Sequence, residues 1–199
     1  MHRKQLTVFL ILLVVYAFIA FATYAFFIDQ LAASAGMPMP DTGMPDSVLG
    51  LINAGIVLVV YGVLGLLGYW FARKLGWPGI FSEDGNWRRW FFIPLLLGLG
   101  CGVLVVVGDL VFAPINGLGR LPHPPFPVSI LASLGAGIGE EILFRGFVFG
   151  LWSLLLNWLL KRVNGRTVAL WIANVIAALA FGASHFATVF ILTKTSSLA

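Results

Sequence analysis

The sequence contains little charge and almost no cysteine. Charged residues make up only 10% of the 199 residues, whereas a soluble globular domain usually carries about 25%. The single cysteine, Cys101, excludes an internal disulfide framework. The net charge of +4 does not indicate a nucleic-acid partner, because the basic residues lie in short loops between apolar segments. These deficits exclude a soluble enzyme and a disulfide-stapled secreted domain.

What the sequence has in abundance is long apolar runs. Hydrophobic residues make up 60% of the chain, and the mean hydropathy is +0.98. A helix that crosses a bilayer needs roughly 20 apolar residues. The runs therefore predict an all-α polytopic membrane protein, a bundle of five spanning helices that contacts lipid. We place these helices at residues 6–28, 48–72, 90–112, 128–160 and 167–192.

The first apolar run has a second interpretation, a cleaved signal peptide. Arg3 and Lys4 precede it, and Ala33-Ser34-Ala35 resembles a cleavage site. The apolar core is, however, longer than the roughly 7–15 residues typical of a signal peptide. We therefore expect an uncleaved transmembrane helix.

The distribution of basic residues predicts the orientation of the protein. Only Arg120 and Lys194 fall in the loops of one side. Because basic loops stay in the cytoplasm, we expect a cytoplasmic N-terminus, and the short loops favour a prokaryotic cell membrane. We further expect residues 1–89 to form two helices and a segment at the interface, and residues 90–199 to form the second unit. The opposite side holds nine basic residues: Arg3, Lys4, Arg73, Lys74, Arg88, Arg89, Lys161, Arg162 and Arg166.

The fourth apolar run contains three ionisable residues close together, Glu140, Glu141 and Arg145. Such groups cost a few kcal/mol each at bilayer depth, so they rarely occur there without a use. Glu141 and Arg145 are four residues apart and can pair on one helix face. Glu140 is rotated by about 100° from Glu141, which leaves its carboxyl group available to take and return a proton.

His185, in the fifth run, is predicted to lie at the same depth as Glu140. The two residues stand roughly 30 Å and 27 Å along their helices from the cytoplasmic ends, at a rise of about 1.5 Å per residue. Phe181 and Asn174 share a face with His185. Phe181 could brace the imidazole, and Asn174 could form a hydrogen bond in the same groove. Glu141 and Arg145 could instead be a buried ion pair with a purely structural role, and His185 could be a core histidine. Glu140 has no such structural explanation, because no second nearby cation neutralises it.

These residues resemble the signature motifs of a known family. Glu140-Glu141-x-x-x-Arg145, followed by Phe181-x-x-x-His185, is similar to the first two motifs of the CPBP intramembrane proteases, which include type II CAAX prenyl endopeptidases and bacteriocin self-immunity proteins. The resemblance covers residues 90–192. It implies a membrane-embedded peptidase with Glu140, Glu141 and His185 as catalytic residues, Glu140 activating a water. Arg145, Phe181 and Asn174 would support them, and the substrate would be a peptide or protein, including lipidated ones.

A divalent metal such as zinc is left open by the sequence. Glu140 and His185 are the candidate ligands, but no His-Glu-x-x-His motif is present and a catalytic zinc uses three protein ligands. The family also carries a third motif, His-x-x-x-Asn or His-x-x-x-Asp, on a later helix, and no histidine follows His185. We expect the chain to be a C-terminally truncated piece of an eight-helix fold; the alternative is a shortened homologue without catalysis.

Two further function classes stay open on the sequence alone. A non-catalytic membrane scaffold or bacteriocin-immunity protein of the same fold would keep the packing motifs but would not need the Glu140 carboxylate. A proton-coupled transporter could use Glu140 as its carrier, but we find no inverted repeat and no paired broken helices.

Overall fold

The computed structural model describes residues 2–34, 43–77, 86–117, 119–120, 123–163 and 165–196. Every regular element within these ranges is helical, which confirms the predicted all-α class. Five helical segments are long and apolar enough to cross a membrane, as predicted. They are Arg3–Ser34, Asp46–Leu75, Phe91–Phe112, Val128–Leu159 and Arg166–Phe186.

Two of the five spans are not uniform α-helices, because each contains a wider π-helical stretch. The second span is built from α2, η1 and α3, and the fourth from α5, η2 and α6. The complete order is α1 (His2–Ser34), α2 (Asp46–Ile56), η1 (Val57–Tyr61), α3 (Gly62–Leu75), α4 (Trp87–Phe112), α5 (Val128–Glu140), η2 (Glu141–Val148), α6 (Phe149–Leu159), η3 (Lys161–Val163) and α7 (Arg166–Ser196).

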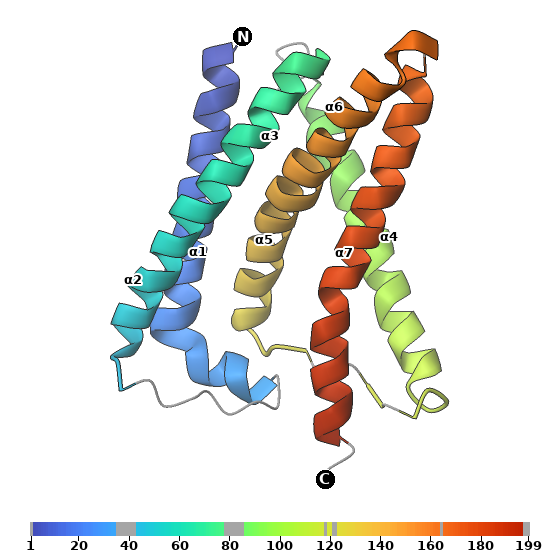
Figure 1. Ribbon diagram of the computed structural model, residues 1–199. Coiled ribbons are helices and arrows are strands. Elements are labelled where there is room, and N and C mark those ends of the chain that lie inside the picture. Colours follow the sequence, from blue (N-terminus) through green and yellow to red (C-terminus); the bar gives the residue numbers. More distant parts are fainter. Residues whose placement is uncertain are drawn as a thin grey trace.

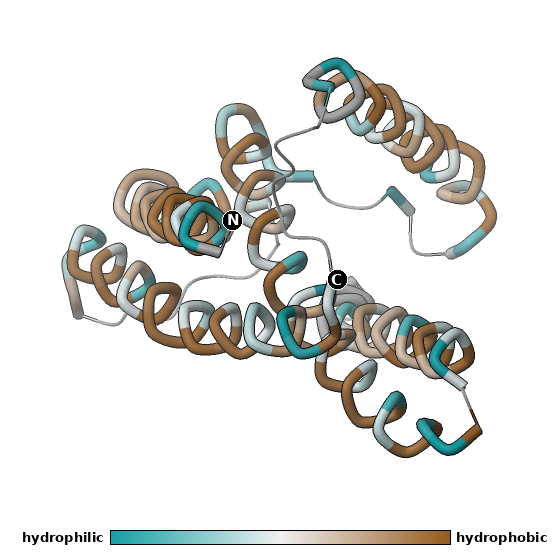
Figure 2. The backbone as a smooth tube through the Cα atoms, turned by 90° about the horizontal axis from the view of Figure 1, so that it is seen from above, coloured by the Kyte–Doolittle hydropathy of each residue, from teal (hydrophilic) through white to brown (hydrophobic). Residues whose placement is uncertain are grey.

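The first, second and fourth spans pack against one another, the fifth packs against the fourth, and one helix stands apart (Figure 1). Helix α1 packs against α2 and α5, α3 packs against η2 and α6, and α6 packs against α7. Seen from above, α4 stands away from the other helices (Figure 2). The predicted division of the chain into two units, residues 1–89 and 90–199, stays a prediction. Helices α1 and α3 of the first unit contact elements of the second. Most of the predicted interfacial segment, from Gly76 to Trp90, lies outside the described residues.

Helix α4 exposes apolar side chains around its whole circumference. None of its most apolar stretch is buried inside the protein, and Leu104, for example, is 73% exposed. A helix that is apolar all round is stable only where something apolar covers it. In a membrane protein that cover is lipid, so this pattern agrees with the integral-membrane class.

Small residues bring the helices into close contact. Because lipid tails are as apolar as leucine, helices associate in a bilayer through close packing rather than through a hydrophobic driving force. At Gly68 of α3, a methyl group would meet the backbone of Gly146 in η2 at 2.7–3.1 Å. At Gly65 it would run into the ring of Phe9 of α1. Helices α1 and α3 therefore lie directly against the fourth span.

The end of α3 is tied to the start of α7. Gly76 adopts a left-handed conformation (φ 65°), and Trp77 N–H donates to the carbonyl of Ala72 at 3.0 Å. This is the Schellman arrangement that glycine favours after a helix. The guanidinium of Arg166 donates to the carbonyl of Leu75 at 2.9 Å, so a cation lies at the negative end of α3.

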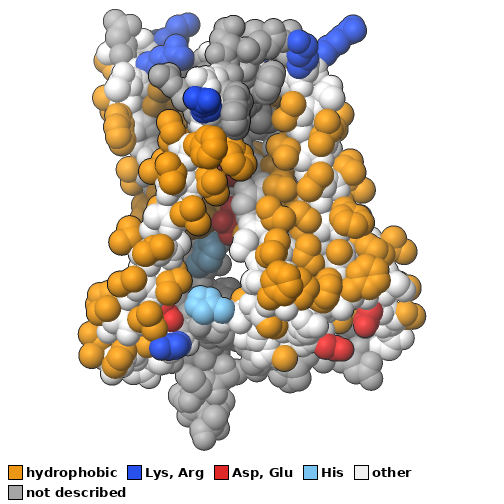
Figure 3. All heavy atoms as spheres, turned by 180° about the vertical axis from the view of Figure 1, so that it is seen from behind, with side chains coloured by type: hydrophobic (Ala, Val, Ile, Leu, Met, Phe, Trp, Pro, Cys, Tyr) orange, Lys and Arg blue, Asp and Glu red, His pale blue; other side chains and the backbone are white. Residues whose placement is uncertain are grey.

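The described charges gather at the two ends of the bundle (Figure 3). Lys and Arg side chains cluster at the end where α1 begins, and Asp side chains lie mainly at the other end. The wall between them is covered with hydrophobic side chains. This is the distribution expected of a protein whose middle is embedded in hydrocarbon.

The glycine contact between α3 and η2 predicts that Gly68→Ala destabilises the protein by about 1–3 kcal/mol, because the methyl group meets backbone atoms that cannot rotate away. The matched control is Gly55→Ala in α2, where an added methyl group has no neighbour within 4 Å. The measurement is the midpoint of thermal unfolding of purified protein in detergent. Equal midpoints for the two variants would contradict the prediction.

Candidate active site

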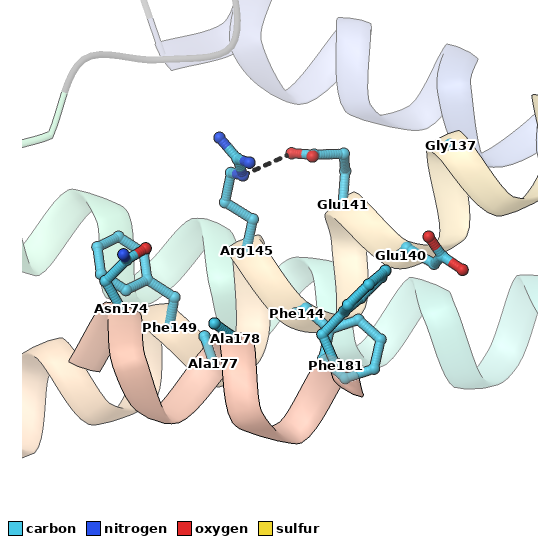
Figure 4. A pocket seen from close by; sticks show the side chains of 10 residues that line it. All are labelled: Gly137, Glu140, Glu141, Phe144, Arg145, Phe149, Asn174, Ala177, Ala178 and Phe181. Carbon is cyan, nitrogen blue, oxygen red and sulfur yellow. Dashed lines mark ion pairs between the residues drawn. The ribbon is translucent and has the colours of Figure 1, made fainter. Parts of the chain in front are cut away.

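The acidic motif lies where the fourth span changes from α-helix to π-helix. Glu140 is the last residue of α5, and Glu141 is the first residue of η2. Extra π-type turns inside α-helices occur frequently at functional sites. Figure 4 shows the two carboxylates pointing away from each other, in keeping with the rotation of about 100° between adjacent helix positions.

Glu140 faces His185 of α7. Its Oε1 lies 3.6 Å from Nε2 of His185, and the two side chains are 37% and 51% exposed, respectively. The depth expected from the sequence is therefore shared by both groups. The spacing is slightly longer than a direct hydrogen bond, and the partial exposure leaves both groups accessible to a small molecule.

The other ring nitrogen of His185 determines how the imidazole is oriented. Nδ1 lies 2.9 Å from the carbonyl oxygen of Phe181 and 3.2 Å from Oγ of Ser184. A carbonyl oxygen can only accept, so Nδ1 carries the proton in the neutral ring. Nε2 then presents a lone pair toward Glu140. The helix backbone thus holds the ring in one tautomer and one orientation.

Aromatic rings hold this histidine from the side. Phe181 and His185 have ring centroids 4.7 Å apart, and Phe181 packs edge-on against Phe144 of η2 at 5.3 Å. Edge-to-face contacts of this kind contribute about 0.5–1.5 kcal/mol beyond the buried area. Phe181 therefore lies beside the imidazole of His185, as expected from the sequence. Phe144 also braces this pair, which the motif alone did not indicate.

Glu141 is paired with Arg145. Its Oε2 lies 3.0 Å from Nε of the guanidinium, and the side chains are 60% and 76% exposed (Figure 4). The acid precedes the base by four residues, the favourable order on a helix. The pair neutralises two charges inside the membrane-spanning region while leaving Glu140 to face His185.

A cavity of about 600 Å³ opens beside these groups. This volume is within the range of small-molecule and peptide sites. Asn174, predicted to share the groove, lies in its wall together with Phe181, and Figure 3 shows acidic and histidine side chains inside a hollow between apolar walls. His185 adjoins the cavity through Glu140. The lining consists of Gly137, Glu140, Glu141, Phe144, Arg145, Phe149, Asn174, Ala177, Ala178 and Phe181.

The described residues do not form a complete zinc site. Among them, no group of three or more His, Cys, Asp or Glu side chains is arranged to hold a metal ion. Glu140 and His185 together supply two donors, whereas catalytic zinc sites use three protein ligands. Glu141 is turned toward Arg145 instead. We therefore route no chemical step through a metal.

Comparison with known families agrees with the resemblance in the motifs. Residues 122–198 match the model of the family described as type II CAAX prenyl endopeptidase Rce1-like. This stretch, which is less than half of the chain, is similar to that family. The match contains all six site residues that were predicted from the sequence, and it begins after α4. No curated protein and no solved structure matched the chain.

Sequence reasoning missed the residues that approach the site from other spans. Tyr16 of α1 packs next to Gly139, and Trp77, just after α3, stacks on Phe149 at 4.9 Å. Phe149 in turn lines the cavity. Aromatic residues are common in apolar helices, so the sequence offered no signal that singled these out. The sequence showed the glycines of α5, but it did not show which helix packs into the space beside them.

The Glu141–Arg145 pair predicts that Arg145→Gln destabilises the protein by about 1–2 kcal/mol, because it leaves a carboxylate within the membrane-spanning region without its cation. The Glu141→Gln/Arg145→Gln double variant should recover most of that loss. The measurement is thermal unfolding in detergent, with Arg120→Gln, in the loop before α5, as the matched control. A double variant as unstable as Arg145→Gln would contradict the prediction.

Proposed function

We propose that the protein is an intramembrane endopeptidase in which Glu140 activates a water molecule for attack on a peptide bond. The observation that carries the proposal is the approach of Glu140 Oε1 to His185 Nε2 at 3.6 Å beside a cavity, within the segment that matches the Rce1-like family. A carboxylate and an oriented imidazole are the groups that general acid–base catalysis needs.

A water beside the pair would donate one O–H to Glu140 and the other to the Nε2 lone pair of His185. Glu140 takes one proton as the water oxygen bonds to the carbonyl carbon of the substrate. The tetrahedral intermediate then collapses with cleavage of the C–N bond. Glu140 returns its proton to the leaving amine, so that the carboxyl group ends ionised, as it began. This sequence consumes one water and needs no other reactant.

The remaining cavity residues fit a substrate that arrives as an extended peptide. The amide of Asn174 can donate to and accept from a peptide backbone. Phe149, Phe181 and the alanines of α7 provide apolar wall for side chains or a lipid modification. The position of the cavity among membrane-spanning helices favours a peptide or protein delivered from the bilayer, lipidated or not.

Glu140→Gln and His185→Ala should each lower the rate of peptide cleavage by at least about 100-fold, because removal of a general base or its water-orienting partner costs about 10²–10⁴. The assay uses purified protein in lipid vesicles, with a prenylated peptide bearing a CAAX tail and an unmodified transmembrane peptide as substrates. Asp109→Asn on α4 and His123→Ala in the loop between α4 and α5 are the matched controls. Unchanged turnover by Glu140→Gln would reject the mechanism and favour a non-catalytic protein of the same fold.

We also propose that the basic end of the bundle, including the N-terminus, faces the cytoplasm of a prokaryotic cell. The positive-inside rule supports this orientation. In a Cys101→Ser background, a membrane-impermeant thiol reagent added to intact cells should label Asp46→Cys at the start of α2. It should not label Lys161→Cys at the end of α6 until the membrane is permeabilised. The reverse pattern would overturn the orientation without affecting the mechanism.

A further inference from the structure

A side chain from outside the family-matched segment packs against the back of the Glu140 site. Tyr16 belongs to α1 and lies against the fourth span at Gly135 and Gly139. These glycines are four residues apart, so they lie on one face of α5 and form a groove. A methyl group at Gly139 would meet the Tyr16 hydroxyl at 2.5 Å and Cζ at 2.7 Å. At Gly135 it would meet the same ring at 3.5 Å.

The phenol is held in this groove from its other side as well. Tyr61, in the π-helical stretch of the second span, packs edge-on against Tyr16 with ring centroids 5.0 Å apart and an interplanar angle of 86°. Tyr16 therefore contacts both the second and the fourth span, and these contacts restrict its rotamer.

The groove ends directly at the proposed catalytic carboxylate. Gly139 immediately precedes Glu140, which is where α5 gives way to η2. A change of helix type is a point where the backbone can adopt alternative turns. The ring thus contacts the last α-helical turn before the site, at the place where a small rotation would move the carboxylate away from His185.

We propose that Tyr16 is a positioning residue of the site, which holds the α5–η2 junction so that Glu140 faces His185. This inference rests on the proposed function for its catalytic consequence, but not for its geometric one. It assigns α1, which lies outside the Rce1-like match, a part in the active site. It also gives a reason for glycine at position 139, since any larger residue would displace the phenol.

The kinetic test uses Tyr16→Ala and Gly139→Ala, each predicted to lower kcat by about 10-fold or more, because misplacing a catalytic group by about 1 Å can cost up to about 100-fold. KM should change less than about twofold, since the cavity wall is untouched. Tyr16→Phe, which keeps the ring, should retain most of the activity. The matched controls are Gly98→Ala, where a methyl group has no neighbour within 4 Å, and Phe18→Ala, at a position that is 67% exposed.

The Tyr16→Ala/Gly139→Ala double variant separates a shared role from two independent defects. If both act through one contact, the double variant should be no slower than the slower single variant. Multiplied losses, or wild-type kcat in both single variants, would overturn the inference.

A second readout needs no activity. In a Cys101→Ser background, the Glu140→Cys/His185→Cys variant should be cross-linked by a short bifunctional thiol reagent, and adding Tyr16→Ala should slow that reaction several-fold. Adding Phe18→Ala should not. An unchanged cross-linking rate with Tyr16→Ala would overturn the positioning role. Absence of peptide cleavage by the unmodified protein would instead reject the proposed function, so the two failures are distinguishable.

Discussion

Charge inside a bilayer is the constraint on which the arrangement of this protein depends. An ionisable group in hydrocarbon costs a few kcal/mol unless it is paired or reaches a hollow that water can enter. The fourth span meets this requirement in two ways. Glu141 pairs with Arg145 at 3.0 Å, and Glu140 faces His185 at 3.6 Å beside a cavity. Adjacent positions on a helix are rotated by about 100°, so one carboxylate meets Arg145 while the other faces His185.

Close packing at glycine holds this arrangement in place. Without a hydrophobic driving force between helices, contacts at backbone distance supply much of the association. The Gly68–Gly146 contact joins α3 to η2, and the Gly135–Gly139 groove receives the ring of Tyr16. Both contacts border the acidic motif. The packing that stabilises the bundle therefore also determines where Glu140 points.

The cavity and the ion pairs make the site a water-accessible region within an apolar shell. Its walls come from α5, η2, α6 and α7, all within or next to the Rce1-like segment, while α1 and α3 support it from behind. Among the described residues that line the cavity, none belongs to α4, and the apolar surface of α4 faces outward.

Much of this protein could be predicted from its sequence, because length and hydropathy alone identify a transmembrane helix. The five spans were placed to within six residues of their observed ends, and the helical rise predicted the shared depth of Glu140 and His185. The π-helical stretches were not predicted, since nothing in Glu141–Val148 distinguishes a π-turn from an α-turn locally. The separation of α4 from the other helices was not predicted either, because the hydropathy of its apolar run lies within the range of the packed spans.

Composition and local spacing therefore determined the class of protein, the number of spans, and the pairing of Glu141 with Arg145, all of which depend on residues near one another in the chain. Tertiary structure alone decided which faces meet. It brought the carboxylate of Glu140 to the imidazole of His185, and the phenol of Tyr16 to Gly139. The physical reason is that helix rotation and tilt are set by packing between spans, which a one-dimensional pattern of hydropathy does not encode.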